Sequence, residues 1–179
     1  TIKNMPALMG ETDVLKAVQL LPGVQSGIEG MSGIYVRGGG PDQNLILLDG
    51  VPVYNVSHLF GFFSVFNGDA ISDVSIIKGG FPAKYGGRLS SVLDIRMKEG
   101  NMYNYNTDIS TGLIASKATV EGPIIKGKSS FIISARRTYL YLIAYPGLIF
   151  YNKLSKTPNP FTAGYFFHDF NAKINYKIT

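Results

Sequence analysis

The sequence has no cysteine, no tryptophan and only two histidines. Without cysteine, neither a disulfide framework nor a thiolate metal site can form, and the redox compartment stays open. His58 and His168 lie far apart and lack the spacing of a zinc site, so we expect no metal and no cofactor. No Ser/His/Asp arrangement with a local catalytic signature is present, and we therefore expect a protein that is not an enzyme.

Charge is also scarce, because charged residues make up 16% of the chain and hydrophobic residues 45%. The formal net charge is +5, but the basic residues are scattered singly, apart from Arg136-Arg137, and form no basic block. This pattern argues against nucleic acid as a partner. The 21 glycines and 11 tyrosines favour β structure over a helical bundle.

Long hydrophobic runs are missing as well. The longest apolar stretch, residues 140–151 (LYLIAYPGLIFY), contains Pro146-Gly147 and is shorter than the roughly 20 residues that a membrane-spanning helix requires. The sequence therefore excludes a helical membrane protein, whereas a protein that crosses the membrane with strands stays open.

Residues 1–99 have the pattern of a small mixed α+β unit. Apolar residues recur at helical spacing after Thr12 and Asp13, either of which can cap the first turn of a short helix. The pair Asp49-Gly50 predicts a tight hairpin turn, since such a turn needs positive φ at its centre. Four short apolar runs bounded by Gly, Pro or Asn predict strands at residues 34–37, 44–49, 73–78 and 91–97.

After Gly100 the sequence alternates with a period of two residues. The clearest case is residues 170–178, where Phe, Ala, Ile, Tyr and Ile alternate with polar residues. Such a strand fits the core face of a soluble sheet or the lipid face of a barrel, and its length approaches the roughly 9 to 11 residues of a membrane strand. Similar segments precede it at residues 107–112, 114–121 and 129–138.

Connections between these segments alternate between short and long, as in bacterial outer-membrane barrels. GPIIKGK joins the second segment to the third, whereas residues 139–166 separate the third from the fourth. We expect this long external loop to place Tyr139, Tyr141 and Tyr145 at the membrane interface, where amphipathic rings are favoured.

Two glycine-rich motifs imitate nucleotide-binding loops. GPIIKGKS at residues 122–129 satisfies the phosphate-loop pattern, but the β-branched, alternating SSFIIS follows it in place of the required helix. Arg37 and the three glycines after it are followed by Pro41 and a strand, which excludes a dinucleotide loop. We interpret both motifs as turns.

The stretch YNVSHLFGFF at residues 54–63 is rich in aromatic residues and punctuated by glycine. Buried packing is one interpretation, because aromatic side chains dominate cores. A ligand site is the other, because binding residues concentrate on loops.

Four motifs in order, LPGV (21–24), IYVRGG (34–39), LLDGVPV (47–53) and ISDVSIIKGGFPAKYGGRLSSVLDI (71–95), closely resemble the plug domain of TonB-dependent outer-membrane receptors. VEGPI, KSSFIISARR and FNAKINYKI are similar to the first barrel strands of this family. The resemblance implies a plug domain at residues 1–99, with a small mixed sheet and short helices. Residues 100–179 would then form the first four or so antiparallel strands of a transmembrane β-barrel, and we expect the chain to be a fragment of the full receptor.

The resemblance also implies roles for single residues. Arg37 and Lys78, in IYVRGG and IIKGG, would contact barrel carboxylates, Lys78 without the bidentate geometry of arginine. Arg88 of YGGRLSS is assigned to the same plug–barrel contacts. For ligand binding we expect six residues on the outward loops of the plug: Gln25, Tyr54, His58, Phe60, Phe62 and Phe63.

The function implied is TonB-dependent import of a scarce nutrient, such as a siderophore, glycan, vitamin or peptide, across the outer membrane of a Gram-negative bacterium. Its partners would be TonB, outer-membrane lipid and, in one branch of the family, a surface lipoprotein. The alternative is a receptor-like barrel that serves as a sealed scaffold subunit in a larger outer-membrane complex. An upstream TonB-contacting box would favour transport.

Overall fold

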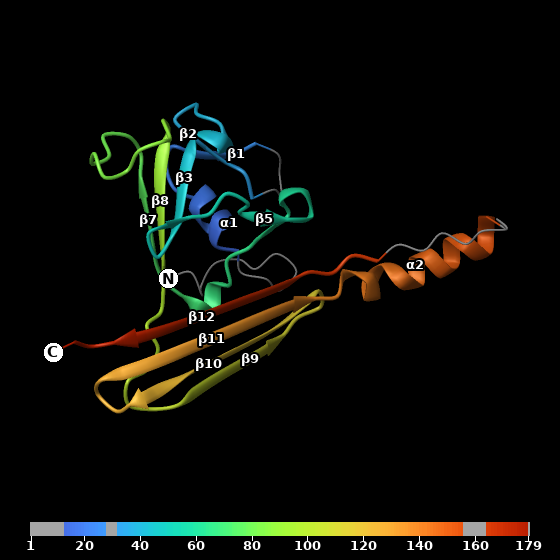
Figure 1. Cartoon of the computed structure of the whole chain (residues 1–179). Helices are drawn as coiled ribbons and strands as arrows, with labels where there is room; N and C mark the ends of the chain where they lie inside the picture. Colours follow the sequence, from blue (N-terminus) through green and yellow to red (C-terminus); the bar gives the residue numbers. More distant parts are fainter. Residues whose placement is uncertain (1–12, 28–31, 156–163, 179) are drawn as a thin grey trace.

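The computed structural model describes residues 13–27, 32–155 and 164–178 of the chain. Figure 1 shows a small domain of helices and short strands above a four-stranded antiparallel sheet, from whose end a long helix projects. The chain passes once from the small domain into the sheet, through residues 98–105.

The first helix, α1 (Val14–Gln19), begins where the sequence predicts. Asp13 is its N-cap, and the Oδ1 atom of Asp13 accepts hydrogen bonds from the backbone N–H groups of Leu15 at 2.8 Å and Lys16 at 3.2 Å. The side chains of Val14 and Leu15 are fully buried. A helix this short depends on such packing, because isolated short helices are marginal in water.

A mixed sheet with the strand order β4-β3-β8-β7 forms the centre of the small domain. Strand β3 runs parallel to β8, whereas the pairs β3–β4 and β7–β8 are antiparallel. The predicted hairpin turn is confirmed, with φ of 48° at Asp49 and 83° at Gly50. The strands of this sheet are β3 (Asn44–Leu48), β4 (Val51–Pro52), β7 (Ile71–Ile77) and β8 (Ser91–Met97).

Two hairpins complete the small domain. Strand β1 (Val24–Ser26) pairs with β2 (Ile34–Val36), and β5 (Ser57–His58) pairs with β6 (Phe63–Ser64). Helix α1, β2, β3 and β8 enclose one hydrophobic core, in which Leu93 and Ile95 are fully buried. Ile132, a residue of the antiparallel sheet, belongs to the same core.

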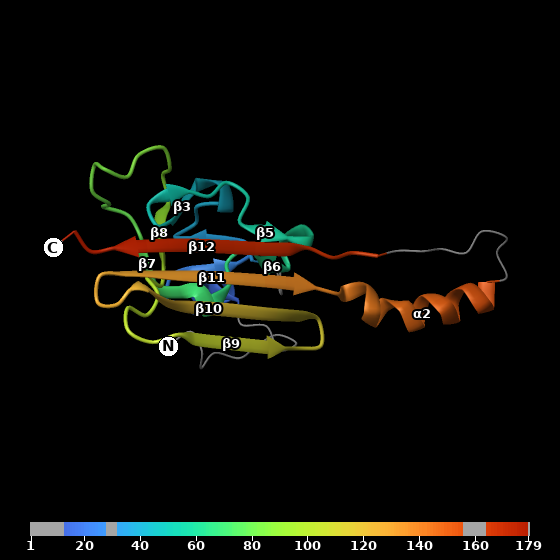
Figure 2. The ribbon, with the colours of Figure 1, turned by 60° about the horizontal axis from the view of Figure 1, so that its bottom comes forward.

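The second sheet has the order β12-β11-β10-β9, so each strand pairs with its neighbour in sequence (Figure 2). All three pairings are antiparallel. Each strand lies where the two-residue alternation predicts one. The strands are β9 (Asn106–Thr111), β10 (Ala115–Ile125), β11 (Ser129–Thr138) and β12 (His168–Tyr176).

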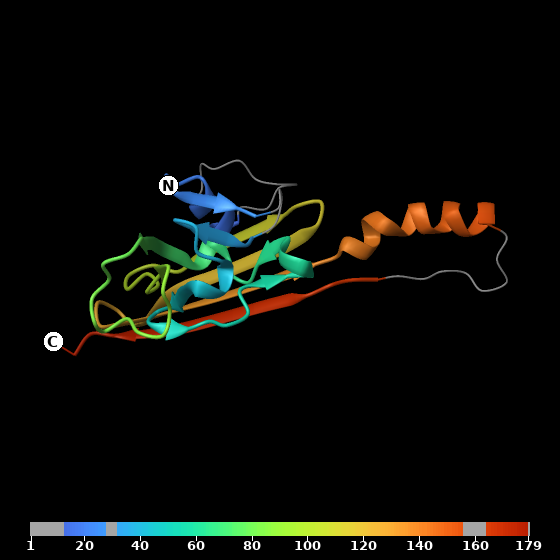
Figure 3. The same cartoon turned by 90° about the horizontal axis from the view of Figure 1, so that it is seen from above.

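The long connection between β11 and β12 contains a helix that the sequence does not predict, α2 (Leu140–Ser155). It extends beyond the end of the sheet, away from the small domain (Figure 3). Pro146-Gly147 in its centre indicates a helix break, but a helix accommodates an internal proline by losing one backbone hydrogen bond. In the part of the chain that the structure describes, no helix is long and apolar enough to cross a membrane.

Candidate functional site

The aromatic stretch at residues 54–63 forms the β5–β6 hairpin and its tip. Leu59 and Phe60 both have positive φ, of 48° and 54°, which bulky residues rarely adopt. The Leu59 N–H donates a hydrogen bond of 3.0 Å to the Tyr165 hydroxyl, and this contact helps to hold the strained tip. The Phe60 side chain is 88% exposed, so the strain presents an aromatic ring to the outside.

The six residues expected to bind a ligand divide into exposed and covered ones. Tyr54, Phe60 and Phe62 are exposed. Gln25 is exposed on β1, directly opposite Tyr35 of β2. Phe63 is only 7% exposed and packs with Ile114 and Phe167 of the antiparallel part. In this structure Phe63 therefore packs between the two parts of the protein.

His58 connects the hairpin to the antiparallel sheet. Its Nε2 lies 2.6 Å from Oδ1 of Asp169 on β12, and its ring stacks on Phe167 with 4.0 Å between the centroids. The other carboxylate oxygen of Asp169 accepts a hydrogen bond of 2.8 Å from Nε of Arg136 on β11. Arg136 also donates to the backbone carbonyl of Ser64, at 2.5 Å.

An open groove of about 440 Å³ lies beside the exposed tip. Uncharged residues line it, and Tyr35 and Phe60 supply its two aromatic rings. The Tyr35 ring packs so closely on Gly27 that a Cβ at Gly27 would lie 2.4 Å from it. The remaining lining residues are Gly33, Pro41, Asn55, Ser57 and Gly61.

Of the three cations expected to contact a barrel wall, Arg37 and Arg88 are exposed and Lys78 is half-buried. Arg37 has a φ of 48° and lies beside Gly79, the Lys78 ammonium donates to the carbonyl of Pro22, and Arg88 lies in an exposed loop. Within residues 13–27, 32–155 and 164–178, none of the three forms an ion pair. The described strands of the antiparallel sheet therefore use other residues to contact the small domain.

Those contacts come from polar residues that face inward on β10, β11 and β12. Lys117 lies 3.6 Å from the carboxylate of Asp69, and Lys173 lies 3.1 Å from that of Asp49. Sequence reasoning missed these residues, although the alternation of polar and apolar residues places all of them on one face of the sheet. Further contacts join Asn67 to Ser134, and Ser130 to the carbonyl of Glu99.

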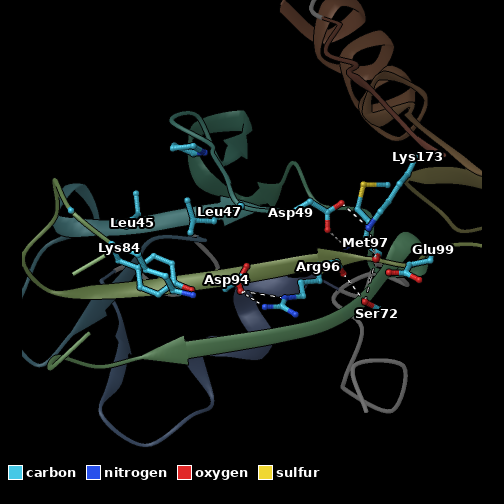
Figure 4. A pocket seen from close by; sticks show the side chains of 14 residues that line it. Leu45, Leu47, Asp49, Ser72, Lys84, Asp94, Arg96, Met97, Glu99 and Lys173 are labelled. Carbon is cyan, nitrogen blue, oxygen red and sulfur yellow. Dashed lines mark hydrogen bonds and ion pairs between the residues drawn. The ribbon is translucent and has the colours of Figure 1, made fainter. Parts of the chain in front are cut away.

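A larger groove of about 940 Å³ lies between the mixed sheet and β12. Figure 4 shows Asp49 and Lys173 pointing toward one another at one end of this groove, beside Met97. Asp94 and Arg96 form a second pair there, and the hydrogen bond that Arg96 donates to the Asp94 carboxylate raises the pKa of Arg96 above its ordinary value. The groove thus has charges of both signs, and two oppositely charged pairs, Lys173–Asp49 and Arg96–Asp94, are already formed in it.

The first half of the chain identifies the protein family. Residues 3–91 match the family model of the TonB-dependent receptor plug domain. This chain belongs to the TonB-dependent receptors. The family consists of receptors of the Gram-negative outer membrane, and the receptor described here is located there as well. The small domain is its plug.

Solved receptor structures share the fold. The siderophore receptor PirA from Pseudomonas aeruginosa is 18% identical with a TM-score of 0.59, and the match covers 99% of this chain and 29% of PirA. The siderophore receptor PirA from Acinetobacter baumannii is 22% identical with a TM-score of 0.54, covering 78% of this chain and 24% of that protein. The chain thus spans less than a third of either receptor. No curated protein matches its sequence.

No group of three or more His, Cys, Asp or Glu side chains that could hold a metal ion occurs among the residues that the structure describes. What these residues do supply is a set of contacts between the plug and the antiparallel sheet, with an exposed aromatic tip at one end of these contacts.

Proposed function

We propose that this chain comprises the plug and the first four wall strands of a barrel that imports a nutrient across the outer membrane with energy from TonB. The observation that carries the proposal is the orientation of the antiparallel sheet. Its polar face packs on the plug, and its apolar face is exposed. A soluble protein would bury the apolar face, because burial of apolar surface is the main driving force of folding.

Cross-strand rows in the middle of the sheet show this orientation. Ser134 pairs with Asn171 and Thr119 on the face toward the plug, whereas Ile133 pairs with Ala172 and Val120 on the opposite face. Ile174 on that outer face is 73% exposed. The outer face is apolar in its middle and becomes polar at Arg137 and His168, as in a band of limited height that contacts lipid.

The lengths of the strands support the same assignment. β10, β11 and β12 contain 11, 10 and 9 residues, close to the roughly 9 to 11 residues of a tilted membrane strand. Exposed aromatic residues lie near both ends of the sheet, as in the aromatic girdles of barrels. They are Tyr105 and Tyr176 near the short turn at residues 126–128, and Phe166 near the long connection.

The outer edges of β9 and β12 are open in the strand order of this sheet. In lipid, open edges leave backbone groups without hydrogen bonds, at several kcal/mol each, so we propose that further strands of the receptor close the barrel. We keep the division into a plug at residues 1–99 and wall strands from residue 100. Gly100 supports this boundary, because it has a φ of 80° and passes so close to β11 that a Cβ there would lie 2.4 Å from the carbonyl oxygen of Phe131.

The exposed tip lies at the end of the sheet where the long connection begins. Long connections of such barrels lie outside the cell, so we propose that this end faces outward and receives the ligand. Tyr54, Phe60 and Phe62 would contact the ligand directly, with Gln25 at the neighbouring hairpin. His58 would hold the tip to the wall, and Phe63 would support it from below.

Transport requires that the plug move, because it fills the interior next to the wall. TonB, acting from the inner membrane, would pull on the plug and break part of the polar contacts to β10–β12. Arg37, Lys78 and Arg88 would contact wall strands beyond those described. Lipid would cover the apolar face, and the outer end would be open to a surface lipoprotein partner.

The test is an uptake screen with the full-length receptor in its bacterium, using panels of siderophores, glycans, vitamins and peptides. We expect one class to be taken up only with an intact tonB gene and a proton gradient. Uptake that persists without TonB would contradict the mechanism. Absence of uptake with an assembled barrel would favour the sealed scaffold.

A further inference from the structure

Ser64, at the end of the β5–β6 hairpin, is held from both sides by groups of opposite charge. Its backbone N–H donates a hydrogen bond of 2.7 Å to Oδ2 of Asp13, the N-cap of α1. Its backbone carbonyl accepts from Arg136 of the sheet, at 2.5 Å. Ser64 is fully buried, Asp13 is 8% exposed and Arg136 is 3% exposed.

The carboxylate of Asp13 serves both α1 and the hairpin. Its Oδ1 accepts from the N–H groups of Leu15 and Lys16, and its Oδ2 accepts from Ser64. The helix cap and the hairpin anchor are therefore one side chain. Any shift of Ser64 away from Asp13 leaves this buried carboxylate with fewer donors, which is costly for a buried charge.

The sheet holds the same hairpin at a second point. Asp169 accepts hydrogen bonds from Arg136 and contacts His58, which pairs across the hairpin with Phe63. A continuous set of contacts thus runs from α1 through Ser64 to Arg136 and returns to the hairpin through Asp169. The N–H and the carbonyl of Ser64 belong to two successive peptide groups, so Asp13 and Arg136 together fix the backbone on both sides of the Ser64 Cα.

We propose that the backbone of Ser64, held at its N–H and at its carbonyl, couples helix α1 to the β5–β6 hairpin, with Arg136 as the positioning residue of this coupling. Loss of the Arg136 contact loosens the cap of α1, and loss of the Asp13 charge loosens the hairpin. The coupling follows from the contacts alone. Its consequence rests on the proposed function: a ligand that moves the exposed tip would alter the start of α1, directly after the N-terminal residues that precede the plug core.

The experiment is hydrogen–deuterium exchange on the full-length receptor in lipid nanodiscs without ligand. With Arg136→Gln, amides of α1 (Val14–Gln19) should exchange about fivefold faster or more, the lower end of typical coupling between sites. With Asp13→Asn, amides of β5 and β6 should accelerate by a similar factor, because coupling is reciprocal. Arg136→Lys keeps the charge and should restore part of the protection of α1.

Lys173→Gln is the matched control, because it removes another contact from the sheet to a plug carboxylate, Asp49, without touching Ser64. It should leave exchange in α1 unchanged. The inference is overturned if Arg136→Gln alters only the hairpin, or if Lys173→Gln loosens α1 equally. If the Arg136→Gln receptor does not assemble, exchange in the Asp13→Asn receptor is the test. Unchanged exchange in β5 and β6 of that variant then overturns the inference. Because the exchange is measured without ligand, its outcome does not depend on whether the receptor transports a nutrient. A failure of the proposed function is therefore distinguishable from a failure of this inference.

Discussion

Arg136 of β11 and Asp169 of β12 form a buried ion pair on the face of the sheet that contacts the plug, with 2.5 Å between Nη2 and Oδ2. Each partner also binds the β5–β6 hairpin, Arg136 through the carbonyl of Ser64 and Asp169 through the ring of His58. The pair therefore belongs to the wall and the plug at once. It holds the plug next to the end of the barrel where we expect the ligand to arrive.

Replacing Arg136 with alanine should destabilise the seated plug strongly. Breaking this buried pair takes the guanidinium away from Asp169 and leaves it with the His58 ring, and loss of one partner of a buried pair costs about 3–5 kcal/mol. Urea unfolding of the full-length receptor in lipid vesicles measures the change. Arg137→Ala is the control, because Arg137 is the next residue on β11 and lies exposed on the opposite face. It should change stability by less than about 0.5 kcal/mol, and equal effects of the two variants would contradict the assignment of the inner face.

The orientation of the sheet in the membrane can be read by labelling single cysteines, since the sequence given contains none. A water-soluble maleimide should not label Ile174→Cys in intact outer membranes, because lipid covers this position. Lys126→Cys, in the short turn between β10 and β11, should be labelled readily. Both positions are exposed in the described structure, so protection of Ile174→Cys reports the lipid itself. Rapid labelling of both cysteines would contradict the assignment of the sheet to a membrane barrel.

Alanine substitutions at Phe60 and Phe63 should have different effects, the first on ligand affinity and the second on stability. Phe60 is 88% exposed, so Phe60→Ala should lower affinity for the nutrient found in the uptake screen and leave the unfolding midpoint unchanged. Phe63 is buried at the contact between plug and sheet, and Phe63→Ala should cost about 3–5 kcal/mol of stability. Binding titrations and unfolding curves on the full-length receptor measure both effects. Unaltered affinity of the Phe60→Ala receptor would contradict the assignment of the exposed tip to the ligand site.

Several features of the fold follow from short stretches of sequence alone. Asp13 caps α1, and Asp49-Gly50 forms the turn that joins β3 to β4. Both features are predictable because each depends on the chemistry of one or two residues. The strands β9 to β12 follow from two-residue alternation, which is a local property of the chain. The ordered motifs between residues 21 and 95 likewise suffice to indicate the plug domain.

Other features depend on contacts between distant segments, so no local sequence pattern predicts them. The parallel pairing of β3 with β8 needs a crossover of more than 40 residues, and α2 forms across a Pro-Gly pair that reads as a break. The residues expected to join plug and wall are Arg37, Lys78 and Arg88, and their wall contacts remain a prediction. The contacts observed belong to Lys117, Arg136 and Lys173.

The sequence by itself determined the plug family and the alternation of polar and apolar residues along the later strands. Alternation assigns two faces to a strand but does not say which face meets the rest of the protein. Only the tertiary structure decided that the polar face packs on the plug and that the apolar face is left uncovered. It also decided that Phe63 is buried while Phe60 is exposed, because burial depends on which distant segments meet, and Phe167 reaches only one of the two rings.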